Sequence, residues 1–199
     1  MVYTILENNK AYSIRKEFEM KKLLVVIDYQ KDFVDGTLGF EKAIHLENGI
    51  YNKVKKYLDE NNKVLFTYDT HLDDYLDTRE GKNLPVVHCI KETEGHELYG
   101  KLKEFSKITN TIHYEKYGFG MAPSDMIKLS NEIGNDINEI EIVGVVTNIC
   151  VISNVVMFQS QFRNAEIVVD GSLCASFNES LHEKTLDVIE GLQGKVVNR

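Results

Sequence analysis

The sequence predicts an α/β domain built as a three-layer, mostly parallel open sheet with helices on both faces. Two observations lead to this fold class. Apolar runs of strand length alternate along the chain with segments whose apolar residues recur at helical spacing. The first run, 23–27, is apolar throughout, which is typical of a strand buried on both faces of a parallel sheet. A chain of 199 residues is long enough to form one such domain.

The first strand is predicted at 23–27, where five apolar residues precede Asp28. A helix is predicted over 41–62, because Ile50, Val54 and Leu58 are spaced to share one helix face. The second strand, 63–71, repeats the pattern of the first and also ends in polar residues. Later strands are predicted at 109–116, 139–146, 165–170 and, as a short last strand, 195–199. The remaining helices are predicted at 122–135, from Asn148 onward, and at 178–192.

Two segments do not fit this alternation. Residues 72–94 are polar and show little periodicity, and a loop of that length in a compact domain is usually functional or disordered. Residues 1–19 precede Met20, which is followed by two lysines and the first strand. We treat 1–19 as an N-terminal extension, leaving open whether it is ordered, and 20–199 as the domain.

Composition excludes several function classes. The net charge of −8 disfavours nucleic acid and anionic membrane as partners, because both attract clustered lysine and arginine. No apolar run approaches the ~18 residues of a membrane span, and the N-terminus lacks a secretory pattern. Three widely spaced cysteines without a CxxC motif argue against a disulfide framework or a cysteine-rich zinc site. These features favour a reducing compartment, and we expect a cytoplasmic protein.

Reactive side chains follow four of the predicted strands. Asp28 ends the first strand, Asp69 and His71 end the second, Lys116 ends the third, and Cys150 follows the fourth. The carboxyl ends of parallel strands meet at one edge of a sheet, where open α/β sheets bind their ligands. Carboxylates after strands often cap the next helix instead, so one such ending would mean little. Together they indicate a candidate site.

Cys150 lies in "GVVTNICVISN", residues 144–154, which begins as a buried strand and ends as a helix. A free cysteine is most often a small core residue. A helix N-terminus and a cation such as Lys116 would instead lower the pKa of its thiol and make it a nucleophile. Cys174 has no evident cation nearby, and Cys89 follows a histidine. The sequence therefore favours Cys150 as the reactive thiol.

Four motifs carry a resemblance to a known family. "VVIDYQKDF", "YDTH", "HYEKYGFG" and "GVVTNICV", in this order and at these separations, resemble the isochorismatase-like cysteine hydrolases, and among them the nicotinamidases. The resemblance runs from about Lys21 to the C-terminus and implies the isochorismatase-like fold. The early D-x-Q-x-D-F together with the turn before the cysteine is a specific combination, whereas each motif alone is weak.

The resemblance implies roles for individual residues. It places the catalytic residues at Asp28, Lys116 and Cys150, with Asp28 as the general acid–base and Cys150 as the nucleophile. It places the oxyanion hole at the backbone N–H groups of Val146 and Cys150. It also implies a cis peptide bond between Val145 and Val146.

Asp69, His71 and His88 form a second candidate constellation. One carboxylate with two imidazoles suits a catalytic zinc, iron or manganese ion. From the residues alone, the favoured interpretation is that Asp69 caps a helix and that His88 is a hydrogen-bonded loop histidine. The resemblance favours the metal, because nicotinamidases have such a site, and implies one divalent ion, zinc first, with no organic cofactor. Whether Glu80 adds a ligand is left open.

The function implied by the resemblance is hydrolysis of nicotinamide or a similar small carboxamide to acid and ammonia, through a thioester, by a homo-oligomer. Phe33, Tyr117 and Phe119 could form an aromatic slot for the ring, although ordinary core packing would explain them nearly as well. Asn148, where the family commonly has aspartate, and the absence of tryptophan leave the substrate open. The alternatives are a metal-free amidohydrolase of N-carbamoyl or ureido compounds and a non-catalytic binding member.

Overall fold

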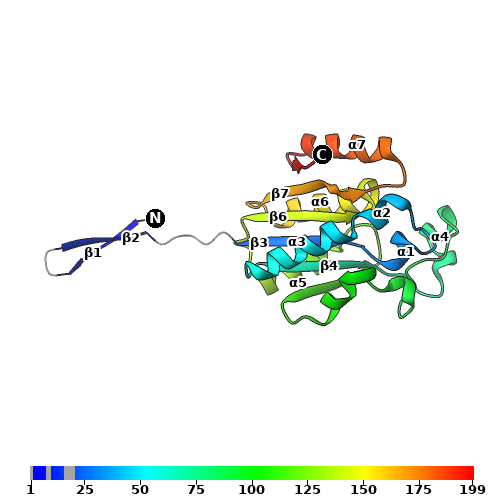
Figure 1. The fold of residues 1–199 in the computed structure, drawn as a ribbon, viewed down its shortest axis with the longest axis horizontal. Helices are drawn as coiled ribbons and strands as arrows, with labels where there is room; N and C mark the ends of the chain where they lie inside the picture. Colours follow the sequence, from blue (N-terminus) through cyan, green and yellow to red (C-terminus); the bar gives the residue numbers. More distant parts are fainter. Residues whose placement is uncertain (1, 8–9, 16–20) are drawn as a thin grey trace.

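A computed structural model describes residues 2–7, 10–15 and 21–199. Its main body contains one sheet of six parallel strands in the spatial order β5-β4-β3-β6-β7-β8. The strands are β3 (Lys22–Ile27), β4 (Lys63–Asp69), β5 (Thr111–Lys116), β6 (Glu139–Val145), β7 (Glu166–Ala175) and β8 (Lys195–Val197). The predicted parallel sheet is confirmed (Figure 1), and the last strand at the C-terminus is present.

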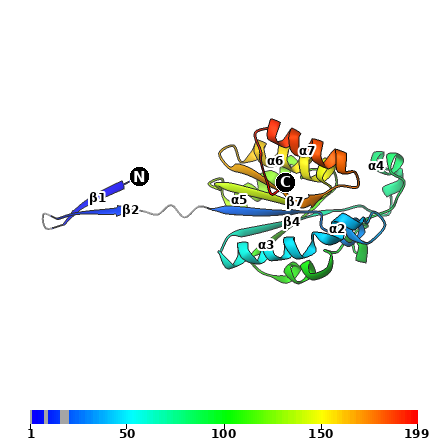
Figure 2. The same ribbon diagram turned by 45° about the horizontal axis from the view of Figure 1, so that its top comes forward.

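Helices cover both faces of this sheet, as predicted for a three-layer fold (Figure 2). One layer holds α5 (Pro123–Ile133), α6 (Ile152–Gln161) and α7 (Glu179–Gly191). The other holds α1 (Lys31–Val34), α2 (Glu41–His45), α3 (Glu47–Asp59) and the 3-10 helix η3 (Gly100–Lys107). Alternate residues of β3 face the two layers: Leu23 and Val25 pack on one side, and Leu24 and Val26 on the other. This double burial explains why the strand is apolar throughout.

The long segment 72–94 has little regular structure but is ordered by short elements. These are the 3-10 helix η1 (Tyr75–Asp77) and α4 (Arg79–Asn83), with η2 (Glu94–His96) directly after. The backbone of His71 pairs with that of Ile90 in an isolated bridge, so the end of this segment lies beside the end of β4. The expectation of a functional or disordered loop therefore missed the short helical elements within this segment.

Three elements differ from the predictions by more than one or two residues at an end. The expected helix 41–62 is divided at Leu46 into α2 and α3. The strand expected at 165–170 continues to Ala175, with a register irregularity opposite β6. The helix expected from Asn148 begins with a π-helical turn, η4 (Thr147–Val151), which continues into α6.

The N-terminal extension expected at 1–19 falls partly on residues 1, 8–9 and 16–19, which lie outside the described residues. Within the described ranges, β1 (Val2–Glu7) and β2 (Lys10–Arg15) pair antiparallel, a hairpin that the sequence analysis did not predict. None of the helices in the described ranges combines the length and apolar character needed to cross a membrane.

A buried ionic cluster ties α3 to the centre of the sheet. Lys53 on α3 forms salt bridges with Glu141 on β6 and with Asp170 on β7, the latter at 2.7 Å, and the Tyr57 hydroxyl donates to Glu141 at 2.6 Å. Burial alone would raise the pKa of Asp170, but hydrogen bonds from Lys53 and Ser172 hold it below its ordinary value. The cluster explains why an otherwise apolar strand carries Glu141.

Replacing Lys53 with methionine should lower the free energy of unfolding by about 3 kcal/mol at pH 7, because two buried carboxylates lose their cation. The depressed pKa of Asp170 means that this stabilisation is present above the carboxyl's ordinary pKa and is lost as the pH falls through its folded value. Urea unfolding at pH 7 and pH 3 measures the loss of stability and its dependence on pH. Lys56→Met, on the same helix with an exposed side chain, should change stability by less than about 0.5 kcal/mol. Equal effects of the two variants at pH 7 would contradict the cluster's role.

Candidate active site

Four neighbouring strands bring one reactive group each to the same edge of the sheet. Asp28 follows β3, Asp69 and Lys116 end β4 and β5, and Cys150 follows β6. All four are buried, with exposures of 0% for Asp28, 2% for Asp69, 2% for Lys116 and 4% for Cys150. The structure therefore brings together the side chains that the strand-end argument selected.

Lys116 is the centre of this group. Its Nζ lies 2.7 Å from Oδ2 of Asp28, 3.1 Å from Oδ1 of Asp69 and 3.6 Å from Sγ of Cys150, and it donates to the Gly118 carbonyl at 3.1 Å. One buried cation thus contacts two carboxylates and the thiol. Burial alone would lower the pKa of Lys116, but these acidic neighbours outweigh it and hold the pKa well above its ordinary value. Lys116 remains charged.

Asp28 is held in place from the adjacent strand. The Thr67 hydroxyl donates to its Oδ1 at 2.7 Å and accepts from its backbone N–H at 3.2 Å. Its backbone has φ +45°, a conformation that non-glycine residues adopt uncommonly. Gln30 has a similar role for Asp69, because its amide donates to the Asp69 carbonyl and accepts from the Asp69 N–H. The sequence analysis did not select either Thr67 or Gln30.

The pKa of the Cys150 thiol is shifted in the direction opposite to the prediction. Burial raises the pKa of its thiol well above the ordinary value, because lost hydration outweighs the attraction of Lys116. The expectation of a lowered pKa considered the cation and the helix start, and did not weigh complete burial, so it was wrong. Burial also raises the pKa of the Asp28 carboxyl, whose carboxylate is therefore a stronger base than usual.

The turn that presents Cys150 has the expected cis peptide bond, between Val145 and Val146. The Val146 carbonyl then accepts from the N–H groups of Ile149 and Val151, at 3.0 and 3.2 Å. Gly144 precedes this turn with φ +115°, and a Cβ there would lie 2.2 Å from the Ile27 carbonyl oxygen. Only glycine allows the two strands to approach this closely.

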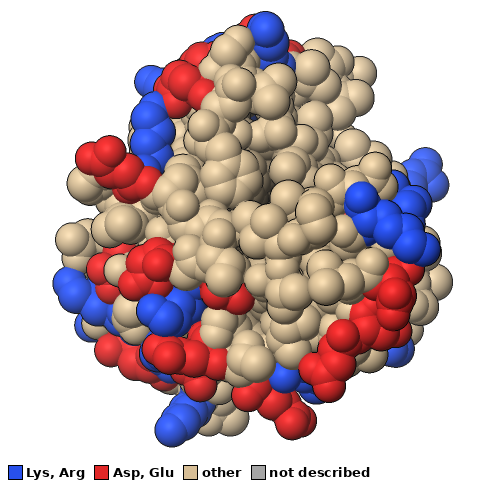
Figure 3. Space-filling view, turned by 90° about the vertical axis from the view of Figure 1, so that its right-hand side faces the viewer, with Lys and Arg blue, Asp and Glu red and all other residues tan. Residues whose placement is uncertain are grey.

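A cavity of about 370 Å³ opens onto Cys150. It lies at the carboxyl edge of the sheet. The face of the molecule at this edge is mostly uncharged at its centre, and charged side chains gather toward its periphery (Figure 3). Its lining is largely apolar: Phe33, Leu38, Leu84, Phe119, Val146, Ile149 and Phe177 surround the cysteine, with Asp69, Arg79, Glu80, Asn83 and His88 as the polar members. Such a lining suits a small, flat and mainly apolar ligand.

The predicted aromatic slot is partly wrong. Phe33 and Phe119 line the cavity, but Tyr117 does not. Its side chain is 62% exposed, and its hydroxyl donates to Glu115 at 3.2 Å. Successive residues of an extended chain point to opposite sides, so the inward direction of Lys116 turns Tyr117 outward. Phe177 supplies another aromatic wall, and it was missed because the strand before it was predicted to end at Asp170.

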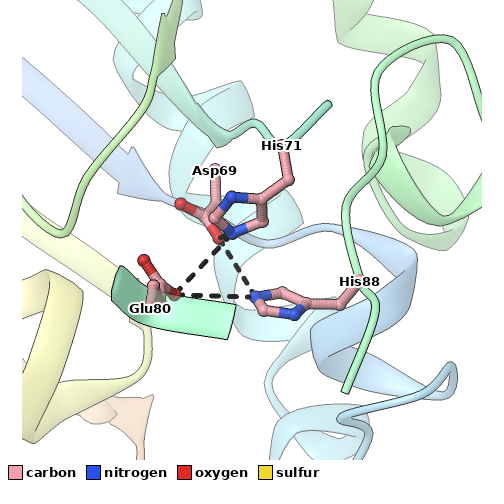
Figure 4. A group of neighbouring side chains, drawn as sticks. All are labelled: Asp69, His71, Glu80 and His88. Carbon is pink, nitrogen blue, oxygen red and sulfur yellow. Dashed lines mark ion pairs between the residues drawn. The ribbon is translucent and has the colours of Figure 1, made fainter. Parts of the chain in front are cut away.

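Asp69, His71, Glu80 and His88 form a compact group in which one ligand atom of each lies within 4.8 Å of the others (Figure 4). Oδ2 of Asp69 lies 3.1 Å from Nε2 of His71 and 3.4 Å from Nε2 of His88. Oε1 of Glu80, on α4, is 3.7 and 4.0 Å from the same two nitrogens. The backbone bridge between His71 and Ile90 brings His88 to this position. The three predicted ligands thus converge, and Glu80 joins them.

The donor atoms fit a divalent cation. His88 Nδ1 lies 2.7 Å from the Val86 carbonyl, which requires an N–H at that position and leaves the Nε2 lone pair directed at Asp69 and Glu80. Nε2 of His71 is buried and makes no hydrogen bond to any residue of the described ranges. Two imidazole nitrogens and two carboxylates facing one another are satisfied by a shared cation, and this nitrogen–oxygen set suits zinc, iron or manganese.

Comparison with known proteins agrees with these features. A model of the isochorismatase domain matches residues 22–199. The chain belongs to the isochorismatase family. It is 35% identical over 173 residues to PncA of Bacillus subtilis strain 168, an uncharacterized isochorismatase family protein, covering 82% of this chain and 91% of that protein.

Solved structures of family members superpose on nearly the whole chain. The crystal structure of the nicotinamidase PncA from Bacillus subtilis matches with a TM-score of 0.79 and 29% identity, over 89% of this chain and 99% of that one. The pyrazinamidase of Pyrococcus horikoshii in complex with zinc matches with a TM-score of 0.76 and 20% identity, over 90% and 99% of the two chains. The second match shows the shared fold.

The purified protein should contain one divalent ion per chain, and His71→Ala should weaken its retention at least about 100-fold, because a direct ligand is lost. Elemental analysis after dialysis against a graded chelator series measures this without any assay of activity. His45→Ala removes a histidine whose side chain is 72% exposed and should leave the metal content unchanged. A wild-type protein that holds no stoichiometric metal under gentle purification would contradict the metal site.

Proposed function

We propose that this protein hydrolyses nicotinamide, or a similar small ring carboxamide, to the carboxylic acid and ammonia through a thioester on Cys150. The observation that carries the proposal is the contact of Lys116 with Asp28 and with Cys150, whose thiol lies beside an apolar cavity that Cys150 helps to line. Membership of the isochorismatase family and the likeness to the nicotinamidase from Bacillus subtilis support the amide-hydrolase activity. The domain that carries it is 20–199, with 1–19 as an N-terminal extension.

The first half of the reaction forms the thioester. Asp28 takes the thiol proton as Cys150 sulfur attacks the amide carbonyl carbon, and the carbonyl oxygen becomes an oxyanion. We assign the oxyanion to the backbone N–H groups of Val146 and Cys150, each worth about 3 kcal/mol if removed. When the tetrahedral intermediate collapses, the C–N bond breaks, Asp28 returns its proton to the leaving nitrogen, and ammonia departs.

The second half reverses these proton transfers with water. Asp28, again a carboxylate, takes a proton from the water that attacks the thioester carbonyl. Collapse of the second tetrahedral intermediate breaks the C–S bond, and the proton on Asp28 returns to the departing sulfur. The raised pKa of Asp28 suits a group that must act alternately as base and acid.

Lys116 stabilises the negative charge that moves within this group. Before reaction the charge lies on Asp28, 2.7 Å away; as the proton transfers, it moves to the sulfur, 3.6 Å away. A fixed ammonium in a buried site stabilises both states with little reorganisation. Asp69 accepts from the same ammonium at 3.1 Å and so links it to the metal-binding group.

We propose that Asp69, His71 and His88, with Glu80 as a fourth ligand, hold one divalent ion, zinc first. The presence of zinc in the fold relative from Pyrococcus horikoshii supports that choice. When bound, the ion supplies positive charge and open coordination positions that orient a ligand in the cavity beside Cys150. Phe33, Phe119 and Phe177 complete the walls against which a flat ring can pack.

The compartment, the oligomeric state and the partners of the enzyme are also proposed. We infer a cytoplasmic homo-oligomer that binds neither nucleic acid nor membrane. The net charge of −8 supports the exclusion of nucleic acid and membrane, and the three free cysteines support a reducing compartment. The homo-oligomer is what the family resemblance implies. The converging metal ligands argue against the metal-free N-carbamoyl or ureido amidohydrolase, and the complete Asp28–Lys116–Cys150 group argues against a non-catalytic member.

Replacing Cys150 with alanine should abolish release of ammonia from nicotinamide, because the thioester cannot form. Cys174→Ala should keep most of the activity, since that thiol is buried in the core away from the cavity. Ammonia release coupled to mass spectrometry of the acid product measures both. Cys150→Ala with more than a few per cent of wild-type turnover would rule out the thioester route. If the wild-type protein were inactive on nicotinamide but active on an N-carbamoyl amino acid, the proposed substrate would be wrong.

Replacing Asp28 with asparagine should lower kcat at least about 100-fold, because the buried thiol then lacks a proton acceptor. Alkylation of Cys150 by iodoacetamide should slow as well, whereas the metal content should be retained. Asp35→Asn, which alters an aspartate paired with Lys31 on α1, is the matched control and should behave as wild type. Unchanged alkylation in Asp28→Asn would show that another group deprotonates the cysteine.

A further inference from the structure

Asn154 is a fully buried polar residue one helical turn beyond Cys150, on α6. Its Oδ1 accepts from the backbone N–H of Met121 at 3.0 Å. Its Nδ2 donates to the carbonyls of Phe119 at 3.1 Å and of Cys150 at 2.8 Å. The amide therefore connects the helix that carries the nucleophile to the segment between β5 and α5.

That segment, 117–122, contributes twice to the site. Phe119 forms part of the cavity wall, and the Gly118 carbonyl accepts a hydrogen bond from Lys116. Gly118 and Phe119 lie within three residues of the backbone groups that Asn154 binds, the Phe119 carbonyl and the Met121 N–H. A shift of this segment would move an aromatic wall of the cavity and remove one acceptor from Lys116.

The segment's own sequence does not fix its conformation. Glycines flank Phe119 on both sides, and neither Gly118 nor Gly120 has a left-handed φ that would require glycine. A Cβ at position 118 would meet no atom within 4 Å, and one at position 120 would only approach Met157 and the Ser153 carbonyl. Because the two glycines are flexible and unstrained, the backbone path of segment 117–122 is set by its contacts with other parts of the chain. Asn154 supplies two of those contacts, and the buried Met121 side chain supplies another.

We propose that Asn154 is a positioning residue that fixes the Phe119 wall of the cavity and so determines affinity for a ring-bearing substrate. The choice of nicotinamide as the probe rests on the proposed function. Asn154 does not reach the reacting atoms itself, because its three hydrogen bonds all go to backbone groups. Lys116 keeps its contacts with Asp28 and Asp69 without it, so binding should depend on Asn154 more than the chemical step does.

The test compares Asn154→Ser with Ser153→Ala. Serine can donate to the carbonyl one turn earlier, as Ser153 and Ser160 already do on this helix at 2.7 Å, so Asn154→Ser keeps the bond to Cys150. The serine side chain is too short to keep the hydrogen bonds that Asn154 makes with the Phe119 carbonyl and the Met121 N–H. The variant should raise KM for nicotinamide about tenfold while kcat changes less than about threefold, the pattern of lost binding common to ground and transition states. Ser153→Ala should leave both constants unchanged.

Hydrogen exchange provides a second readout that needs no activity. The Met121 amide should exchange at least about tenfold faster in Asn154→Ser, because its acceptor is gone, and at the wild-type rate in Ser153→Ala. Asn154→Ala should show the same rise in KM and the same faster exchange of the Met121 amide. Unchanged Met121 exchange, or faster exchange with an unchanged KM, would overturn the proposal. Failure of the wild type to hydrolyse nicotinamide would overturn the proposed function, and Met121 exchange would still decide whether Asn154 anchors the segment.

Discussion

The site depends on one buried cation. Lys116 is 2% exposed and would be very unfavourable there alone, since an unpaired charge in a protein interior costs several kcal/mol. Asp28 and Asp69 compensate by approaching its ammonium to 2.7 and 3.1 Å. The same contacts fix the positions of the two carboxylates, one beside the Cys150 thiol and the other in the candidate metal-binding group. A single ammonium therefore sets the geometry of both halves of the site.

The parallel sheet makes this convergence possible. Because β5, β4, β3 and β6 are adjacent and run in the same direction, residues that follow them in sequence meet at one edge although they lie far apart along the chain. Small residues and hydrogen bonds then adjust each position. Gly144 lets β6 approach Ile27 closely, and Thr67 and Gln30 hold the two aspartates from neighbouring strands.

Much of this arrangement could be predicted, for identifiable reasons. Continuous apolar strands indicated the sheet, and strand-end polarity indicated Asp28, Asp69, Lys116 and Cys150, because both signals are local. The raised pKa of Cys150 depends on complete burial, which only the packed structure reveals. Phe177 was missed because β7 continues through a register irregularity that no sequence pattern marks. The wall formed by Phe119 depends on Asn154, whose partners lie 33 and 35 residues away.

The central claim is that the buried group formed by Asp28, Lys116 and Cys150 acts as one unit that carries an acyl group on sulfur. Acid quenching during steady-state turnover of nicotinamide, followed by peptide mass spectrometry, tests it most directly. The account predicts a nicotinoyl adduct on the peptide that contains Cys150, removed by hydroxylamine as a thioester should be. Turnover at full rate with no adduct on Cys150, or with the adduct on another residue, would contradict it.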